Sequence, residues 1–273
     1  MGETCIPLNP QRIVTLDILS LGDTLALGVK PIASAIWSPT ESLSEMPPYL
    51  RDKINGIVLH GFSTSQPNLE TILQLKPDLI ITPSDPSSKE QYQQLSHIAP
   101  TVLVPWAEIS RDWKQHLKET AKVLDKTEIA DRLLINYYQR VEKIKQMLQN
   151  KPTLASFIYV GNGGVYLTQK NSFSGTILND LGLLSPKSSN DLALPISEES
   201  WSEIDSDVIF IGCYQKDDCS TLEAIKRKPL WSKVNAVKQN QVFPVDFQTW
   251  YGFDFLASDA VLDDIEKYLL DRK

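Results

Sequence analysis

The sequence predicts an α/β fold of two Rossmann-like lobes joined by a single long helix, with a ligand cleft between the lobes. Three observations lead to this prediction. Short β-rich runs alternate with helical stretches, which is typical of a largely parallel sheet covered on both faces. A segment of the first half recurs in the second half. A strongly helical stretch lies between the two copies.

The repeated segment contains a helical turn with a glutamate, a polar turn and a buried strand. Its copies cover residues 68–81 and 197–211, and Glu70 aligns with Glu199. Solenoid repeats have periods of roughly 20–50 residues, so this much longer spacing indicates a duplicated domain. Two similar lobes would enclose a cleft, which suggests a binding function.

Apolar runs bounded by turn residues predict the strands, and amphipathic runs that stop at glycine predict helices. The predicted strands of the first half are residues 12–16, 31–36, 54–58, 78–82 and 101–104, with a helix at 20–27. The second half has predicted strands at 155–160, 208–211 and 241–245, and helices at 176–181 and 257–270.

Residues 112–149 form the strongest helical pattern. From Ile129 to Leu148, apolar residues recur every three or four positions, and charged residues fill the other side. This stretch could be a surface helix of one domain, but its position between the repeats favours a connector. We therefore expect an amino-terminal lobe at 1–123, a connecting long helix at 124–150 and a carboxyl-terminal lobe at 151–273.

Charge and hydropathy exclude several classes of protein. The 273 residues carry a net charge of −7, whereas a nucleic-acid surface needs clustered Lys and Arg. No apolar run approaches the ~20 residues that cross a bilayer. The start of the sequence lacks a signal-peptide pattern, as expected for a cytoplasmic protein or for a processed chain.

Three cysteines are too few for a disulfide framework. Cys213 and Cys219 flank a polar loop, and a local disulfide between them is compatible with an oxidising compartment. The sequence leaves this pairing open. A structural zinc site needs four ligands, which the surroundings do not supply, and Cys5 has an ordinary apolar context.

Six motifs, in order along almost the whole chain, carry a family resemblance. They are residues 6–14, 27–32, 68–81 with the turn Lys76-Pro77-Asp78, 229–231, 235–238 and 241–243. In these motifs the chain resembles the periplasmic substrate-binding proteins of iron–siderophore ABC importers, a class that includes cobalamin and haem carriers.

The resemblance implies a ferric siderophore ligand held between two α/β lobes at the carboxyl ends of the strands. The general rule for open α/β sheets gives the same location. A single connecting helix would limit lobe closure to small rocking. The resemblance also implies a monomer without a cofactor, periplasmic or tethered to the membrane and facing the periplasm, that delivers its ligand to an ABC permease dimer.

One surface glutamate per lobe docks onto permease arginines in this family. By the resemblance these are Glu70 and Glu199. The alternative is that each is a first-turn glutamate favoured by the helix dipole. Their equivalent places in the two copies favour docking.

The loops after the predicted strands are rich in aromatic and hydroxyl side chains, which suit a bulky ligand with apolar and polar faces. For Trp250 and Tyr251, the alternative to a place in the cleft is a place in the hydrophobic core. The candidate ligand-binding residues are Trp37, Phe62, Ser84, Asp85, Trp106, Asn162, Phe173, Tyr214, Trp250 and Tyr251.

These loops contain no arginine, the side chain that pairs best with carboxylate or catecholate oxygens. A hydroxamate or citrate-hydroxamate siderophore, or a neutral macrocycle, therefore fits better than a tricatecholate. His60 could ligate iron directly, but siderophores supply their own ligands, so an ordinary turn residue is favoured. His97 and His116 lie in helical stretches and are expected to be structural.

An α/β enzyme is the alternative from another class. The loop at 161–164 lacks the Gly-x-Gly-x-x-Gly pattern, and the chain has no Gly-x-Ser-x-Gly elbow. His60 and Asp85 could form an acid–base pair, but no nucleophile is placed beside them. We therefore expect a binding protein, with a cobalamin or haem carrier as the nearest rival and a permanent receptor or scaffold subunit as a third possibility.

Overall fold

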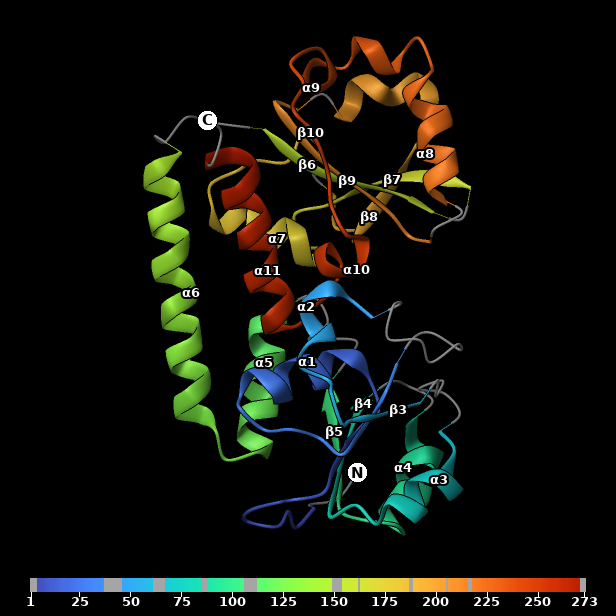
Figure 1. Cartoon of the computed structure of the whole chain (residues 1–273), viewed down its shortest axis with the longest axis vertical. Helices are drawn as coiled ribbons and strands as arrows, with labels where there is room; N and C mark the ends of the chain where they lie inside the picture. Colours follow the sequence, from blue (N-terminus) through green and yellow to red (C-terminus); the bar gives the residue numbers. More distant parts are fainter. Residues whose placement is uncertain are drawn as a thin grey trace. The chain divides into compact units, whose positions relative to one another are not determined.

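A computed structural model of the chain confirms a two-lobed α/β fold (Figure 1). The chain divides into an amino-terminal unit, Met1–Ile135 with Phe253–Leu256, and a carboxyl-terminal unit, Asn136–Gly252 with Ala257–Lys273. The structure describes residues 4–36, 46–60, 67–84, 88–105, 112–148, 154–161, 163–186, 189–204, 206–215 and 218–270.

The amino-terminal unit contains a five-stranded, wholly parallel sheet in the order β3-β2-β1-β4-β5. The order reverses at β1, which pairs with β2 on one side and β4 on the other. This is a doubly wound arrangement, in which ligands bind outside the carboxyl ends of the strands at the reversal. The strands are β1 (Ile13–Thr15), β2 (Ala33–Ala35), β3 (Val58–His60), β4 (Leu79–Ser84) and β5 (Thr101–Pro105).

Helices cover both faces of this sheet (Figure 1). On one face, α3 (Leu69–Leu75) and α4 (Ser88–Ser96) place Ile72 and Leu95 in a core cluster with Val14 and Ile80 of the strands. On the other, α1 (Ile18–Ala26) packs against α5 (Trp113–Val123). The short α2 (Pro48–Arg51) follows β2 in the chain.

The carboxyl-terminal unit has a second five-stranded sheet, in the order β10-β9-β6-β7-β8. Its parallel part is β6, β9 and β10, whereas β7 pairs antiparallel with both neighbours. The expected strands did not include β7 or β8. The chain reverses directly after β6, at Gly163 with φ 74°, which glycine adopts readily. The strands are β6 (Ala155–Gly161), β7 (Gly164–Thr168), β8 (Ala193–Ile196), β9 (Val208–Cys213) and β10 (Val242–Pro244).

Two layers also cover the second sheet. One layer contains η2 (Glu198–Ile204), α8 (Asp218–Lys226), η3 (Trp231–Lys233) and α9 (Asn235–Lys238), and buries Trp201 and Trp231 against the strands. The other contains α7 (Phe173–Asp180) and α10 (Phe247–Trp250). Figure 1 shows α8 and α9 above this sheet and α7 and α10 below it. The last helix, α11 (Phe255–Ile265), continues into a π-helical turn, Glu266–Leu270.

The two copies of the repeat make equivalent contacts in their own units. In the first copy, the Asp78 carboxylate accepts hydrogen bonds from the backbone N–H groups of Gln11 and Arg12, at 2.7 and 2.9 Å. In the second, the Asp207 carboxylate accepts one from Leu154 N, at 2.9 Å. Each aspartate therefore fastens the chain entering the neighbouring central strand, β1 or β6.

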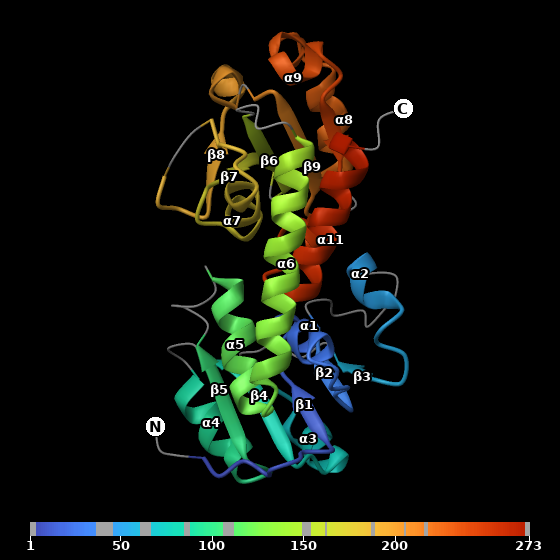
Figure 2. The ribbon, with the colours of Figure 1, turned by 90° about the vertical axis from the view of Figure 1, so that its left-hand side faces the viewer.

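Two expected boundaries were wrong for local reasons. The strand expected at 54–58 lies at Val58–His60, because Gly56 has a φ of 79° and the chain turns there. The helical stretch at 112–149 is divided into α5 and α6 (Thr127–Met147), with Asp125 at φ 53° between them. Figure 2 shows α6, which contains the boundary between the two units. Within the described ranges, no helix combines the length and hydrophobicity of a membrane span.

Candidate ligand-binding site

The reversal point of the first sheet lies between β1 and β4, and polar groups occupy the ends of both strands. Asp17 follows β1 and caps α1: its carboxylate accepts from Ser20 N at 2.7 Å and Ser20 Oγ at 2.6 Å. Ser84 ends β4 and is partly buried. These positions follow from the strand order.

Most candidates of the amino-terminal unit cannot be placed. Trp37, Phe62, Asp85 and Trp106 lie outside the described residues. The backbone of His60 ends β3, but its side chain is not described. Their roles as ligand contacts stay predictions.

The carboxyl-terminal unit carries a group of touching aromatic rings at the carboxyl ends of its parallel strands. We call it the aromatic cluster, and it consists of Tyr159, Tyr166, Tyr214, Phe247 and Tyr251. Tyr159 of β6 lies opposite Tyr166 of β7, and their rings stack at 5.1 Å. Phe247 and Tyr251, one helical turn apart, also stack at 5.1 Å.

Phe247 joins the parts of the cluster. Its ring centre lies 5.0 Å from that of Tyr159 and 5.2 Å from that of Tyr214, the latter edge to face. Phe247 itself is buried, whereas Tyr214 is 45% exposed. The cluster therefore has an apolar base and an accessible rim with phenol hydroxyls, a combination suited to a ligand with both apolar and polar faces.

Two tyrosines of the cluster, Tyr159 and Tyr251, have raised pKa values. Burial, and then the neighbouring phenols of Tyr251, Tyr166 and Tyr214, raise the pKa of Tyr159 to about 12. Burial, and then Tyr214, raise the pKa of Tyr251. Within the described residues, no lysine or arginine contributes to either shift. Tyr159 and Tyr251 thus offer neutral hydroxyl groups as well as ring faces.

Two predicted site residues of this unit lie in its core. Trp250 is fully buried and stacks on Phe210 at 4.3 Å, and its indole N–H donates to Asp264 at 2.9 Å. This is the core position that the sequence left open for Trp250. Phe173 is 1% exposed at the start of α7. Because both side chains are buried, we exclude them from the proposed site. Asn162 lies outside the described residues.

Sequence reasoning missed Tyr159 and Tyr166. Tyr159 stands in an apolar run that predicts a buried strand, and period-2 alternation would have placed it on the face opposite Ile158 and Val160. Both of those neighbours belong to the core beneath α8. The antiparallel partner that brings Tyr166 beside Tyr159 was not recognised, so the pair could not be found.

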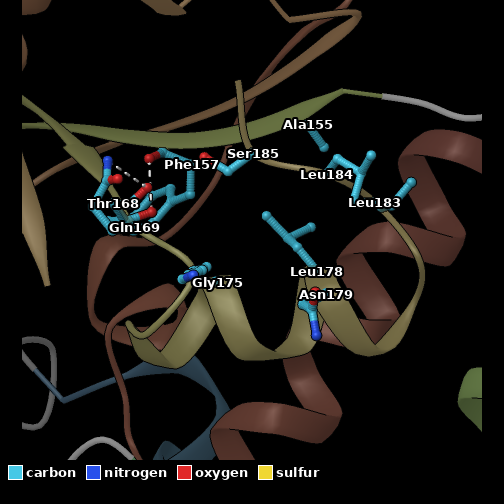
Figure 3. Close-up of a pocket in the computed structure, with 11 residues that line it drawn as sticks. Ala155, Phe157, Thr168, Gln169, Gly175, Leu178, Asn179, Leu183, Leu184 and Ser185 are labelled. Atoms are coloured by element: carbon cyan, nitrogen blue, oxygen red, sulfur yellow. Dashed lines mark hydrogen bonds between the residues drawn. The ribbon is translucent and has the colours of Figure 1, made fainter. Parts of the chain in front are cut away.

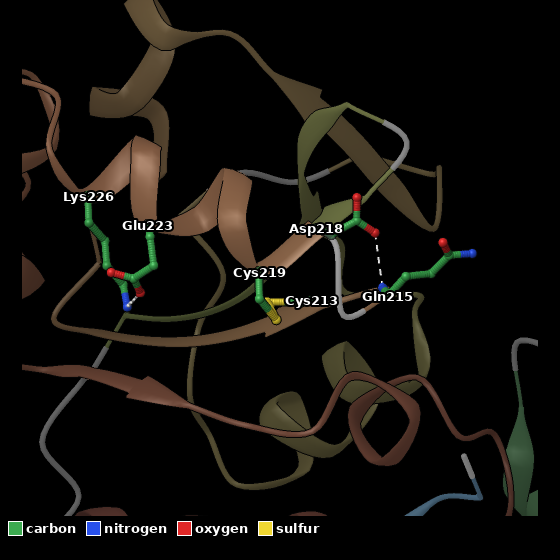
Figure 4. Close-up of a disulfide and its surroundings, with 6 residues drawn as sticks. All are labelled: Cys213, Gln215, Asp218, Cys219, Glu223 and Lys226. Atoms are coloured by element: carbon green, nitrogen blue, oxygen red, sulfur yellow. Dashed lines mark hydrogen bonds and ion pairs between the residues drawn. A yellow bond between two sulfur atoms is a disulfide. The ribbon is translucent and has the colours of Figure 1, made fainter. Parts of the chain in front are cut away.

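Cys213 and Cys219 form a disulfide, with their Cα atoms 5.4 Å apart (Figure 4). Cys213 ends β9 and Cys219 lies in the first turn of α8. Tyr214 of the aromatic cluster directly follows Cys213 in the chain. The bond therefore lies beside the candidate site.

A cavity of about 240 Å³ lies in the same unit, between β6 and α7 (Figure 3). None of the predicted site residues lines it. Its apolar wall includes Phe157 and Leu178, and its polar groups Thr168 and Gln169 donate to nearby backbone carbonyls. Gln169 Oε1 has no hydrogen-bond partner among the described residues, but because none of the predicted site residues lines the cavity, it is a weaker candidate than the aromatic cluster.

Glu70 and Glu199 are both exposed. Glu70 lies in the first turn of α3, and Glu199 lies in η2. Hydrogen bonds from its own backbone N–H and from Ser197 lower the pKa of Glu199. Among the described residues, no group of three or more His, Cys, Asp or Glu side chains could hold a metal ion.

The chain is similar to known binding proteins in both sequence and structure. The family described as periplasmic binding protein matches residues 13–249. The probable siderophore-binding lipoprotein YfiY of Bacillus subtilis is 32% identical over 286 residues, covering 98% of this chain and 85% of the relative. The achromobactin-binding periplasmic protein of Dickeya dadantii is 30% identical over 276 residues, covering 94% and 86%. The structure of Staphylococcus aureus SirA complexed with staphyloferrin B matches with a TM-score of 0.79 at 29% identity, covering 98% of this chain and 96% of that chain.

Proposed function

Because this chain belongs to the periplasmic binding protein family, we propose that it captures a ferric siderophore and delivers it to an ABC import permease. The relatives named for siderophore or achromobactin binding support this ligand class, as does the structural relative that holds staphyloferrin B. The family consists of binding proteins rather than enzymes, and we infer no catalytic role for this chain.

The aromatic cluster is the observation that carries the proposal for the ligand. Its rings provide a broad apolar surface, and the phenol hydroxyls of Tyr159 and Tyr251 can donate hydrogen bonds to ligand oxygens. An anionic tricatecholate would need cations instead, and none perturbs Tyr159 or Tyr251 within the described part of the chain. We therefore favour a ferric hydroxamate or citrate-hydroxamate. Iron would be held by the siderophore, and no further cofactor is proposed.

Fluorescence titration tests the ligand class, because the chain has six tryptophans and nine tyrosines. The panel comprises ferrioxamine B, a ferric citrate-hydroxamate, a ferric tricatecholate, haem and cobalamin. We expect saturable quenching by the hydroxamates at micromolar concentration or below. Quenching by none of the panel would refute the proposed function, and preferential binding of haem or cobalamin would replace the siderophore as the ligand.

A Tyr159→Ala variant connects the ligand to the cluster. Removing one stacked ring should weaken hydroxamate binding about tenfold, since an aromatic pair contributes about 0.5–1.5 kcal/mol beyond area burial. Tyr268→Ala is the matched control, because Tyr268 stacks on Phe243 outside the cluster. Equal affinities for the Tyr159 variant and the wild type would remove the cluster from the site.

Delivery to the permease is the second part of the proposal. We propose that Glu70 and Glu199 dock onto permease cations, which is supported by their exposure and by their equivalent places in the repeat. We further propose that the protein acts as a monomer. The names of its relatives, a lipoprotein and a periplasmic protein, support a periplasmic or membrane-tethered location. We also propose that residues 1–123 and 151–273 act as the two lobes and that residues 124–150 act as the helix that connects them.

A further inference from the structure

The Cys213–Cys219 disulfide connects the hydrophobic core to a proposed ligand contact. Cys213 packs against the core cluster beneath α8, and the next residue, Tyr214, packs on Phe247 in the aromatic cluster. Successive residues at a strand end point to opposite faces. The covalent bond on one face therefore restrains the backbone that presents Tyr214 on the other.

Other described contacts hold Tyr214 only in part. Its backbone N–H donates to Val160 O at 2.8 Å, its Cβ lies directly over Gly161, and its ring packs edge to face on Phe247, but 45% of the residue is exposed. Beyond it, Gln215 N donates to Asp218 Oδ2 at 3.0 Å, at the start of α8 (Figure 4). The disulfide is the covalent restraint on this short connection between β9 and α8.

We propose that the Cys213–Cys219 disulfide fixes Tyr214 in its ligand-contacting position, and that reduction of this bond weakens ligand binding while the unit stays folded. The inference rests on the proposed function. The fold should survive reduction because the bond closes a short loop, with a sequence separation of 6, and the stabilisation by a disulfide grows with loop length. The core around Cys213 also contains many residues besides it.

The reductant would be a dithiol. Its first thiolate attacks Sγ of Cys219, an exposed residue, the disulfide breaks, and Cys213 leaves as a thiolate that takes up a proton. The second thiol then attacks the mixed disulfide and releases Cys219. Two electrons and two protons pass to the protein, which becomes a dithiol, and the reductant becomes a disulfide. An oxidising compartment would keep the protein in the tight-binding form.

The test compares ligand affinity in four proteins: wild type, Cys213→Ser/Cys219→Ser, Tyr214→Ala, and the triple variant. With ferrioxamine B as the probe, we expect the serine pair to raise Kd by about tenfold, close to the effect of Tyr214→Ala. In the Tyr214→Ala background, the serine pair should then have no further effect. Cys5→Ser is the matched control, because Cys5 is the exposed free cysteine.

Wild-type affinity in the serine pair would overturn the proposal. So would an undiminished effect of the serine pair in the Tyr214→Ala background, because the disulfide would then act elsewhere. Amide hydrogen exchange of Tyr214, followed by NMR, gives a readout that needs no ligand. We expect faster exchange in the serine pair but not in Cys5→Ser, and equal rates would overturn the positioning role even if no chelate binds the wild type.

Discussion

At position 161, a side chain has no room beside the aromatic cluster. A Cβ on Gly161 would lie 2.7 Å from the Cβ of Tyr214, which is closer than carbon atoms approach without displacement. Gly161→Ala should therefore move Tyr214 and raise Kd for ferrioxamine B by about tenfold if one aromatic contact is lost.

A second glycine separates this effect from general destabilisation. Gly182 has a φ of 75°, and among the described residues only Lys145 lies near its Cβ position, so Gly182→Ala should cost about 1–2 kcal/mol of stability through backbone strain. Its ligand affinity should stay that of the wild type. Ligand titration measures the affinity of both variants, and thermal unfolding measures their stability. Equal ligand affinities for Gly161→Ala and Gly182→Ala would contradict the prediction.

A buried ion pair should make stability pH-dependent. His116 Nδ1 lies 2.6 Å from Asp23 Oδ2, and both side chains are buried. Burial lowers the pKa of His116, but the hydrogen bond and charge of Asp23, with the charges of Asp17 and Asp254, outweigh it and raise the pKa above 6.5. The stabilisation is then fully present below pH 6.5 and is lost as pH rises through the folded-state pKa.

Denaturant unfolding between pH 6 and pH 9 measures this loss. The free energy of unfolding of the wild type should fall across the range, whereas the neutral variant Asp23→Asn/His116→Gln should show a flatter profile. Equal slopes for the two proteins would assign the pH dependence to other groups. His116→Ala alone should also destabilise the fold, because it removes the partner of Asp23 Oδ2; burial raises the pKa of Asp23, and its Oδ1 would keep the hydrogen bond from Phe255 N.

The elements with one strong local signal were predictable from the sequence. The apolar runs of β1, β4, β6 and β9 predicted strands, and the 3/4 spacing of α6 predicted a helix. The fold class and the family resemblance are confirmed. The pairing of β6 with β7 depends on a turn whose glycines look like an ordinary loop. The loops after the strands gave Tyr214 and Tyr251 as candidates, but the place of Tyr166 beside Tyr159 depends on that pairing, so the whole cluster could not be assembled from local patterns.

Helix α6 is fastened to the last helix within the carboxyl-terminal unit. The Arg140 guanidinium pairs with Asp259, Asp263 and Glu266 at 2.6, 2.5 and 2.8 Å, and Figure 2 shows α6 beside α11. The three carboxylate side chains are 55%, 70% and 31% exposed, so each pair is worth at most about 1 kcal/mol.

Arg140→Met, which retains an apolar stem, should therefore lower the free energy of unfolding by about 1–2 kcal/mol at low salt. The difference from wild type should shrink in 1 M NaCl, where charges are screened within about 3 Å. Lys145→Met is the control, because Lys145 lies 3.9 Å from the exposed Glu142 and should contribute little. A salt-independent loss at Arg140 would mean that packing, not charge, fastens the helix.

At the scale of the molecule, the repeat accounts for the two similar units and gives each an equivalent polar anchor and an equivalent surface glutamate. Asp78 and Asp207 hold the entries to the central strands. Their side chains are committed to backbone N–H groups, which explains why an aspartate stands in both copies. Glu70 and Glu199 are exposed, and within the described residues no contact like that of the two aspartates is shared by them.

Transport by whole cells decides whether these glutamates dock onto the permease. In cells that depend on this chain for ferric siderophore uptake, Glu70→Ala/Glu199→Ala should abolish uptake and leave ligand affinity unchanged, because neither residue belongs to the aromatic cluster. Glu90→Ala/Glu128→Ala is the matched control, since both are exposed glutamates in the first turns of other helices. If the helix dipole were the only reason for Glu70 and Glu199, the two double variants would transport equally well. Uptake lost only with the first pair would assign both residues to docking.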